Sequence, residues 1–240
     1  MKTILEADSV TKSYGPVQVI NGLCLKIQEG EIYGLLGVNG AGKTTLMKMI
    51  LGLQQMDSGA IYVCGEDIKR SPAYLAKVGS LIENPVFYEH LNACEILSMH
   101  LAYMHKKGNI PEALRLAGLD RVGQKPISQY SFGMKQRLGV ARAVIHHPRL
   151  LVLDEPLNGL DPVAITELRA LFKKLKNEGM SVLLSSHMLG ELQHTADRIG
   201  ILSRGCISEE FSTSEKMAVC GTDFEEYVIN LMREDEHGLV

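Results

Sequence analysis

The sequence has no long hydrophobic run, no strong excess of one charge and no cysteines at metal-site spacing. No window approaches the roughly 18 apolar residues that a membrane helix needs, and the N-terminal stretch MKTILEADSV lacks the apolar segment of a signal peptide. A net charge of −3 gives no electrostatic reason for a nucleic-acid partner, although it is compatible with a local basic patch. We therefore expect a soluble chain that binds no nucleic acid.

The cysteines are odd in number and far apart in the chain: Cys24, Cys64, Cys94, Cys206 and Cys220. Reduced thiols in a cytosol are the simple interpretation. The composition is ordinary for a soluble protein, with 45% hydrophobic and 22% charged residues, and there are no internal repeats. A chain of 240 residues can bury a sizeable core as one domain, or as a core with an inserted lobe.

The order of expected elements indicates an α/β fold. The first third alternates in hydrophobicity as a half-buried sheet does, with strands over 4–14, 23–28, 31–37 and 60–68. Turns are expected at 15–16, 21–22, 29–30 and 57–59. A helix over 43–53 interrupts this sheet. The next stretch is helical, with helices over 93–105, 110–119 and 131–147.

The second half alternates strands and helices. Residues 149–154, RLLVLD, form the continuous apolar run of a parallel strand covered on both faces. A helix is predicted over 161–179, with Asp161 as its N-cap. Strands at 180–187 and 197–203 flank a helix at 188–196. We predict one domain over 1–240, with an α/β core at 1–84 and 148–210, a helical subdomain at 85–147, and a C-terminal tail at 211–240 that contains a helix at 223–234.

The segment GVNGAGKT fits the P-loop pattern G-x-x-x-x-G-K-[ST]. Its glycines let backbone N–H groups point at phosphate oxygens, and the following helix N-terminus favours an anion. Lys43 can reach the β- and γ-phosphates, and the Thr44 hydroxyl can ligate Mg²⁺. A glycine-rich loop without a ligand is the alternative, but a strand before it and a helix after it are the setting that this mechanism requires. The predicted phosphate-binding residues are Gly37, Asn39, Gly40, Ala41, Gly42, Lys43, Thr44 and Thr45.

The apolar run 150–153 ends in two acids, Asp154 and Glu155. Burying carboxylates at a strand end is unfavourable unless cations or hydrogen bonds satisfy them. We expect Asp154 to hold Mg²⁺ through water and Glu155 to orient and deprotonate the attacking water. The alternative is a strand that ends in solvent, where Glu155 opens the next turn.

The motifs and their order resemble the ATP-binding subunits of ABC transporters, over roughly residues 4–210. No Asn-Lys-x-Asp segment occurs that would read guanine. The resemblance implies a RecA-like P-loop NTPase core with an N-terminal antiparallel β-subdomain and an inserted α-helical subdomain, and ATP and Mg²⁺ as cofactors. It also implies that Tyr14 stacks on adenine and that His187 contacts the γ-phosphate. A surface tyrosine in a turn and a structural histidine are the alternatives.

The segment QYSFGMKQR, 129–137, stands where this family has its signature motif. It keeps Ser131 and Gly133, whereas Phe132 and Met134 replace the usual Gly and Gln. The resemblance implies a head-to-tail dimer, in which Ser131 and Gly133 of one subunit face the γ-phosphate held by the other, and NGLD at 158–161 matches the family's D-loop. The alternative is an N-capped helix and nothing more. Either two copies of this chain or this chain and a different cassette would form the pair.

Glu83, in the segment LIENP, stands at the family's Q-loop in place of the usual Gln. Its carboxylate can replace the amide oxygen as a Mg²⁺ ligand, or it is a plain surface acid. An acid here, together with SFGMKQR, resembles the subfamily that exports lantibiotics and bacitracin-like peptides for self-protection. The following Val86, Phe87 and Tyr88 either receive a helix of the membrane subunit or pack beneath the helical subdomain.

We therefore predict an ATPase subunit held at the cytoplasmic face of the membrane by a separate transmembrane permease. The predicted catalytic residues are Glu155, His187 and Lys43, and the predicted metal ligands are Thr44, Glu83 and Asp154. The alternatives are an exporter with another cargo, a soluble ABC ATPase of translation or DNA repair, and a nucleotide-binding regulatory module without turnover. Paired cassettes in one chain or a long coiled-coil insert would favour a soluble ABC ATPase, and this sequence has neither.

Overall fold

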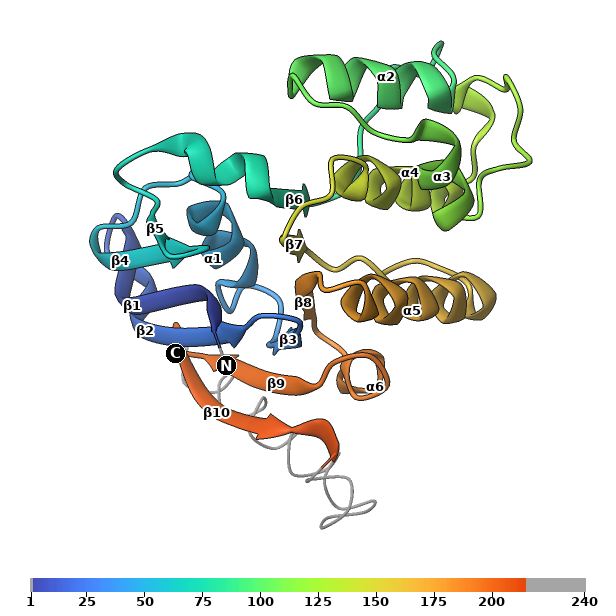
Figure 1. Ribbon diagram of the computed structural model, residues 1–240. Coiled ribbons are helices and arrows are strands. Elements are labelled where there is room, and N and C mark those ends of the chain that lie inside the picture. The colour runs from blue at the N-terminus through green and yellow to red at the C-terminus, as the bar shows by residue number, and fades with distance from the viewer. Residues whose placement is uncertain (1, 215–240) are drawn as a thin grey trace.

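The computed structural model describes residues 2–214. The tail helix predicted at 223–234 lies outside the described residues. Within them the elements form two sheets and a lobe of helices, which stands apart from the N-terminal sheet (Figure 1). The predicted α/β fold, with an antiparallel N-terminal sheet and an inserted group of helices, is confirmed.

Six strands form the central sheet, in the order β10-β9-β3-β8-β7-β6. They are β3 (Ile32–Leu36), β6 (Val78–Leu81), β7 (Leu150–Leu153), β8 (Ser181–Ser186), β9 (Arg198–Ser203) and β10 (Cys206–Ser212). Neighbours are parallel except for β9 and β10. Because β7 lies between β6 and β8 and is covered on both faces, all of its residues are buried, as its apolar sequence predicts.

Helices cover both faces of this sheet. The side chains of α1 (Lys43–Ile50) share a hydrophobic cluster with Leu150 and Val152 of β7, whereas α5 (Pro162–Asn177) and α6 (Leu189–Leu192) share another with Leu151 and Leu153. Asp161 caps α5 as predicted, accepting hydrogen bonds of 3.0 Å from the N–H groups of residues 163 and 164. The carboxyl ends of β3, β6, β7 and β8 therefore meet at one edge of the sheet.

The N-terminal sheet is antiparallel, in the order β2-β1-β4-β5. Its strands are β1 (Thr3–Tyr14), β2 (Val17–Gln28), β4 (Ser58–Val63) and β5 (Glu66–Asp67). The predicted turn at 21–22 is wrong, because β2 runs through it as one strand. The pairing with β1 shifts register there, and Gly22 adopts φ +57°. Asn21-Gly22 is thus a bulge, which glycine permits without ending the strand.

The helical lobe contains α2 (Ala93–Tyr103), α3 (Ile110–Leu116), the short η2 (Ile127–Gln129) and α4 (Phe132–Val144). A capping box starts α2: Asn92 Oδ1 accepts from the Glu95 N–H at 3.0 Å, and a Glu95 carboxylate oxygen accepts from the Asn92 N–H at 2.8 Å. Ile96 and Leu138 belong to the buried cluster that these helices share. The 3-10 turn η1 (Pro72–Lys77) precedes β6, against which α4 packs.

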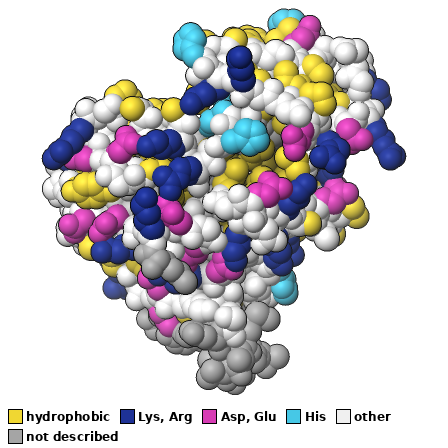
Figure 2. Space-filling view, viewed as in Figure 1, with side chains coloured by type: hydrophobic (Ala, Val, Ile, Leu, Met, Phe, Trp, Pro, Cys, Tyr) yellow, Lys and Arg dark blue, Asp and Glu magenta, His cyan; other side chains and the backbone are white. Residues whose placement is uncertain are grey.

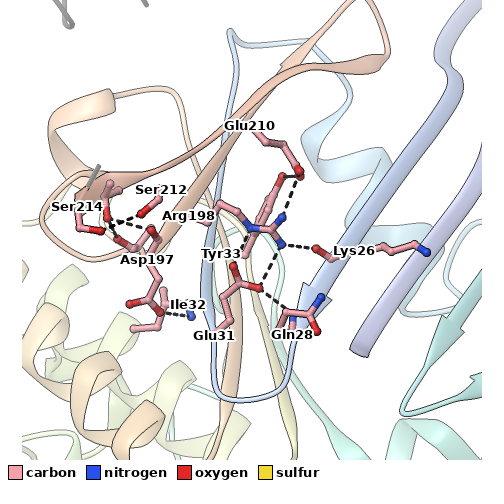
Figure 3. Close-up of polar contacts among 12 residues, drawn as sticks. Lys26, Gln28, Glu31, Ile32, Tyr33, Asp197, Arg198, Glu210, Ser212 and Ser214 are labelled. Carbon is pink, nitrogen blue, oxygen red and sulfur yellow. Dashed lines mark hydrogen bonds and ion pairs between the residues drawn. The ribbon is translucent and has the colours of Figure 1, made fainter. Parts of the chain in front are cut away.

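Two elements of the second half differ from expectation. The helix predicted at 188–196 is reduced to the four residues of α6, and β10 runs to Ser212, beyond the expected core boundary at 210. Contacts from distant segments hold β10 in place (Figure 3): Arg198 Nη1 lies 3.2 Å from Glu210 Oε2, and the Tyr33 hydroxyl donates to Glu210 at 2.5 Å. No helix within residues 2–214 has the length and apolar character needed to span a membrane.

Candidate active site

The P-loop connects β3 to α1 at the carboxyl edge of the central sheet. Gly42, the N-cap of α1, adopts φ +106°, and a Cβ there would lie 2.7 Å from Cδ1 of Ile20. Only glycine meets both conditions. No side chain caps the first turn of α1, so its N–H groups are available to an anion. Gly40 and Asn39 lie at the exposed tip of the loop.

Lys43 ties the loop to the end of β7. Its side chain is buried, and Nζ donates hydrogen bonds to the carbonyl oxygens of Gly37 at 2.6 Å and Val38 at 3.2 Å. The same nitrogen lies 3.2 Å from Glu155 Oε1. A buried ammonium is thus held beneath the loop that the sequence predicts to cradle phosphate.

Asp154 follows β7 and is only 5% exposed. One carboxylate oxygen accepts from the Thr44 hydroxyl at 2.6 Å, and the other accepts from the Ser185 hydroxyl at 2.7 Å. These hydrogen bonds satisfy the buried charge. The contact also places two hard oxygen donors, of Thr44 and Asp154, side by side, which is the donor chemistry that Mg²⁺ requires. Residues 2–214 contain no cluster of three or more His, Cys, Asp or Glu suited to a metal. Mg²⁺ usually keeps several waters and is bound through one or two carboxylates together with phosphate oxygens.

Glu155 lies between Lys43 and His187. Its Oε2 is 2.9 Å from His187 Nδ1, while Oε1 is buried near Lys43 without hydrogen-bond geometry. Its backbone adopts φ +48°, an uncommon conformation for this residue type, and its N–H donates to the Ser185 hydroxyl at 2.8 Å. A carboxylate held in this way can accept a proton from a water molecule and share it with the neighbouring imidazole.

Ser185 is a site residue that the sequence interpretation missed. Its hydroxyl donates to Asp154 and accepts from the backbone of Glu155, and so fixes both acids at once. A signal was present, because Ser185 lies two residues before His187 in a strand parallel to β7. Carboxyl ends of adjacent parallel strands meet, and a small hydroxyl there reaches the neighbouring acids.

Glu83 follows β6 and forms an ion pair of 2.6 Å with Lys48 of α1, a partner that the sequence interpretation also missed. The Glu83 carboxylate raises the pKa of Lys48, and Asp154 and Tyr14 add smaller contributions of the same sign, so all three lie within electrostatic range of Lys48. Glu83 is exposed and adopts φ +60°. Its assignment as a Mg²⁺ ligand stays a prediction.

Tyr14 ends β1 and is 47% exposed, with Lys12 Nζ 5.5 Å from the centre of its ring. Thr45 and Ala41 are half-buried on either side of the loop–helix junction. The ring of Tyr14 is thus accessible to a flat ligand near α1, which is what stacking on a base needs.

Ser131 and Gly133 lie in a different environment. The Ser131 hydroxyl accepts from the Met134 N–H at 3.3 Å and caps α4. A Cβ on Gly159 would lie 3.2 Å from the Phe132 ring, so this segment packs against residues 158–161. Within residues 2–214 neither Ser131 nor Gly133 forms a hydrogen bond with the P-loop. The structure therefore brings together the P-loop, Asp154, Glu155 and His187, and leaves Ser131 and Gly133 outside that group.

Comparison with known proteins places this geometry in context. A family model described as ABC transporter matches residues 20–158. An uncharacterized ABC transporter ATP-binding protein of Bacillus subtilis, YcbN, is 46% identical over 90% of this chain and 71% of its own length. The bacitracin transport ATP-binding protein BcrA of Enterococcus faecalis is 44% identical over the same shares. The lantibiotic transport ATP-binding protein SrtF of Streptococcus pyogenes is 40% identical over 89% of this chain and 94% of its own.

Solved structures show the same fold. One described as an ATP binding subunit of an ABC transporter superposes with a TM-score of 0.85 at 29% identity, over 95% of this chain and 99% of the other. A second, the ATP-binding cassette MJ0796 in a dimeric post-hydrolysis state with ADP and Pi, gives a TM-score of 0.79 at 24% identity, over 87% of this chain and 98% of the other. The agreement covers both sheets and the lobe.

Proposed function

Because the chain belongs to the ABC transporter family, as one of its ATP-binding and ATP-hydrolysing subunits, we propose that it powers a separate permease that exports a bacitracin- or lantibiotic-like peptide. The proposal of a bacitracin- or lantibiotic-like cargo rests on the similarity to BcrA and SrtF, whose names state bacitracin and lantibiotic transport. The acid at Glu83 and the SFGMKQR segment support the same subfamily. The alternative within the family is an exporter of another cargo.

The nucleotide is proposed to bind along the P-loop. Tyr14 stacks on the adenine, the backbone of 37–42 cradles the phosphates, and Thr44 and Asp154 hold Mg²⁺. When bound, Mg²⁺ supplies charge neutralisation on the phosphates. Lys43 stabilises negative charge at the β- and γ-phosphates, and Glu83 adds an oxygen near the metal once it is released from Lys48.

Hydrolysis is proposed to depend on Glu155. Its carboxylate orients a water molecule and accepts the proton that the water loses. The water oxygen attacks the γ-phosphorus while the bond from that phosphorus to the β–γ bridging oxygen breaks, so that ADP leaves and inorganic phosphate forms. His187, hydrogen-bonded to Glu155, keeps the carboxylate in place and lies where it can contact the γ-phosphate. Ser185 positions Glu155 through its backbone.

Two cassettes are proposed to close head to tail. Ser131 and Gly133 lie at the exposed start of α4, outside the group formed by the P-loop and Asp154. An N-capped helix start there suits an anion bound by another subunit. The related cassette solved as a dimer supports this arrangement. Two copies of this chain or two different cassettes fit equally.

The permease is proposed to bind at the helical lobe and to hold the chain at the inner face of the membrane. Val86 and Tyr103 are 86% and 87% exposed, and Tyr88 is 59% exposed. Large apolar side chains that are exposed together favour a protein–protein contact. In the division that we predict, with a core at 1–84 and 148–210 and a subdomain at 85–147, this contact would lie on the subdomain.

The function is tested in cells. The chain is expressed with the membrane proteins encoded beside it, and survival is measured against bacitracin and a nisin-like lantibiotic. We expect protection with the wild-type chain and none with Glu155→Gln. Absence of protection, with the purified chain still hydrolysing ATP, would contradict the cargo and leave the family assignment untouched.

A further inference from the structure

Tyr14, the residue that we propose to stack on adenine, lies where its strand loses regular support. Strand β1 pairs with β4 no further than Thr11, which faces Ser58, so residues 12–14 have no described partner on β4. On the other side, the pairing of β1 with β2 shifts register before and after Lys12. A strand end that is unpaired on one edge and irregular on the other is held only weakly by its ladder.

Asp57, directly before β4, takes the place of the missing strand residue. Its N–H donates to the Thr11 carbonyl oxygen at 2.9 Å, and one carboxylate oxygen accepts from the Ser13 N–H at 2.7 Å. The other carboxylate oxygen accepts from Lys12 Nζ at 2.7 Å. These hydrogen bonds from Lys12 and the Ser13 N–H lower the pKa of Asp57, so the carboxylate is charged at neutral pH. One residue thus holds the stretch of β1 that leads directly into Tyr14.

The ammonium that Asp57 binds also lies against the ring of Tyr14. Lys12 Nζ is 5.5 Å from the ring centre, within the range of a cation–π contact. The side chain of Lys12 is only 11% exposed, whereas Tyr14 is 47% exposed. The ammonium therefore restrains the ring from within the protein, and much of the ring stays open to a base. By fixing Lys12, Asp57 limits the orientations of the ring as well as the path of the backbone.

The surrounding charges do not provide a general field that could act in the same way. Figure 2 shows basic and acidic side chains side by side over the region that the N-terminal sheet and α1 occupy in Figure 1. Charges of both signs that lie close together largely cancel at a distance, and salt screens what remains. The effect of Asp57 on Tyr14 therefore comes from its direct contacts.

We propose that Asp57 is a positioning residue for the nucleobase, whose carboxylate holds Lys12 and the end of β1 so that the Tyr14 ring is oriented for stacking before the nucleotide binds. This inference rests on the proposed function, because it requires that Tyr14 stacks on adenine. A ring that is ordered in advance loses less entropy on binding. Asp57 thus strengthens nucleotide binding and leaves the hydrolytic step unchanged. The alternative is that Asp57 only closes the turn before β4.

The test measures the Kd of the full chain for Mg-ADP, and for pyrophosphate with Mg²⁺, which lacks a base, by isothermal titration calorimetry. We expect Asp57→Ala to raise the Kd for ADP about three- to tenfold, less than Tyr14→Ala does, and to leave the Kd for pyrophosphate unchanged. The KM for ATP should rise by the same factor at constant kcat. Asp57→Asn keeps an acceptor for the Ser13 N–H and should recover part of the affinity. Asp8→Ala, at an exposed aspartate of the same strand, is the matched control and should bind ADP as the wild-type chain does.

The double variant Tyr14→Ala/Asp57→Ala separates positioning from a structural role. Once the ring is absent, Asp57→Ala should change the Kd for ADP less than twofold. An equal effect of Asp57→Ala with and without the ring, or an equal weakening of pyrophosphate, would overturn the positioning role. An unchanged Kd in Asp57→Ala, with a raised Kd in Tyr14→Ala, overturns this inference alone. An unchanged Kd in Tyr14→Ala contradicts the proposed stacking on adenine and overturns the inference with it.

Discussion

The charged groups at the carboxyl edge of the central sheet have partners within the chain, whereas Arg142, at the hollow between residues 86–88 and α2, has no charged partner among the described residues. At the edge, Asp154 receives a hydrogen bond on each oxygen, and Glu155 lies between an ammonium and an imidazole. Arg142 of α4 has no ion pair or hydrogen bond within residues 2–214, and its guanidinium lies 5.2 Å from the centre of the Phe87 ring. The acids of the first region have charged or hydrogen-bonding partners within the chain, whereas the guanidinium of Arg142 has no charged partner among the described residues.

This difference fits the role that we propose for each region. A site for hydrolysis must hold its groups in fixed positions before the reaction, and internal hydrogen bonds do that. A docking surface must exchange its contacts with a partner, so it retains exposed apolar residues and an unpaired charge. Experiments on each region test this contrast.

The largest effect is expected at the edge. Asp154→Asn keeps the shape of the side chain but removes the charge that supports Mg²⁺, so the Mg²⁺ concentration needed for half-maximal ATP hydrolysis should rise about 10- to 100-fold. Steady-state phosphate release across a Mg²⁺ series measures this. Asp120→Asn, on the surface of the lobe, is the control. An unchanged Mg²⁺ dependence in Asp154→Asn would remove Asp154 from the metal site.

An intermediate effect is expected at His100 of α2 as the pH falls. Burial, His146 and Arg142 lower the pKa of His100 to about 4, whereas the pKa of a histidine in the unfolded chain is near 6.5. Between these values the unfolded chain binds the extra proton. Stability should therefore fall as pH drops from about 6.5 to about 4, with a slope from this residue of at most about 1.4 kcal/mol per pH unit.

Urea denaturation at several pH values between 7 and 4.5 measures this slope. His100→Gln should flatten it, because the substituted side chain does not titrate. His105→Gln, at an exposed position two residues after the end of α2, should leave the slope as in the wild-type chain. If both variants show the wild-type slope, the acid sensitivity arises elsewhere.

The smallest effect is expected at the ion pair between Lys48 of α1 and Glu83, which follows β6. The pair formed by Lys48 and Glu83 is exposed, with 37% and 63% of the two side chains accessible, and exposed ion pairs contribute about 0–1 kcal/mol to stability. Glu83→Gln should change the unfolding free energy by no more than that and should retain substantial ATPase activity. Complete loss of activity at saturating Mg²⁺ would show that the charge of Glu83 is essential.

The sequence predicted best the elements that local signals define. The P-loop helix, β7 and the capped α5 each carry a periodicity or a terminal residue that is sufficient by itself. The turn predicted at Asn21-Gly22 was wrong because this dipeptide occurs both in hairpin turns and in bulges. Only the pairing of β2 with β1 distinguishes the two. Strand β10 was missed; it pairs with the neighbouring strand β9, and Tyr33, distant in sequence, adds a hydrogen bond to Glu210 that no local pattern reveals.

The same limit applies to the site. Lys43, Thr44, Asp154 and Glu155 belong to motifs with a fixed spacing, so their proximity could be predicted. The ion pair of Lys48 with Glu83 joins α1 to the end of β6, and the isolation of Arg142 depends on which residues fail to reach it. Neither leaves a pattern in the sequence, because both result from tertiary packing.

The measurement that tests the account most directly is phosphate release by the purified chain with Mg-ATP, compared with Glu155→Gln and with Glu178→Gln as an exposed control. We expect turnover in the wild type and in Glu178→Gln, and its loss, with ATP binding retained, in Glu155→Gln. We also expect the rate per molecule to rise with protein concentration as cassettes pair. Unchanged hydrolysis in Glu155→Gln would contradict the assignment of the catalytic base and, with it, the functional interpretation of the carboxyl edge.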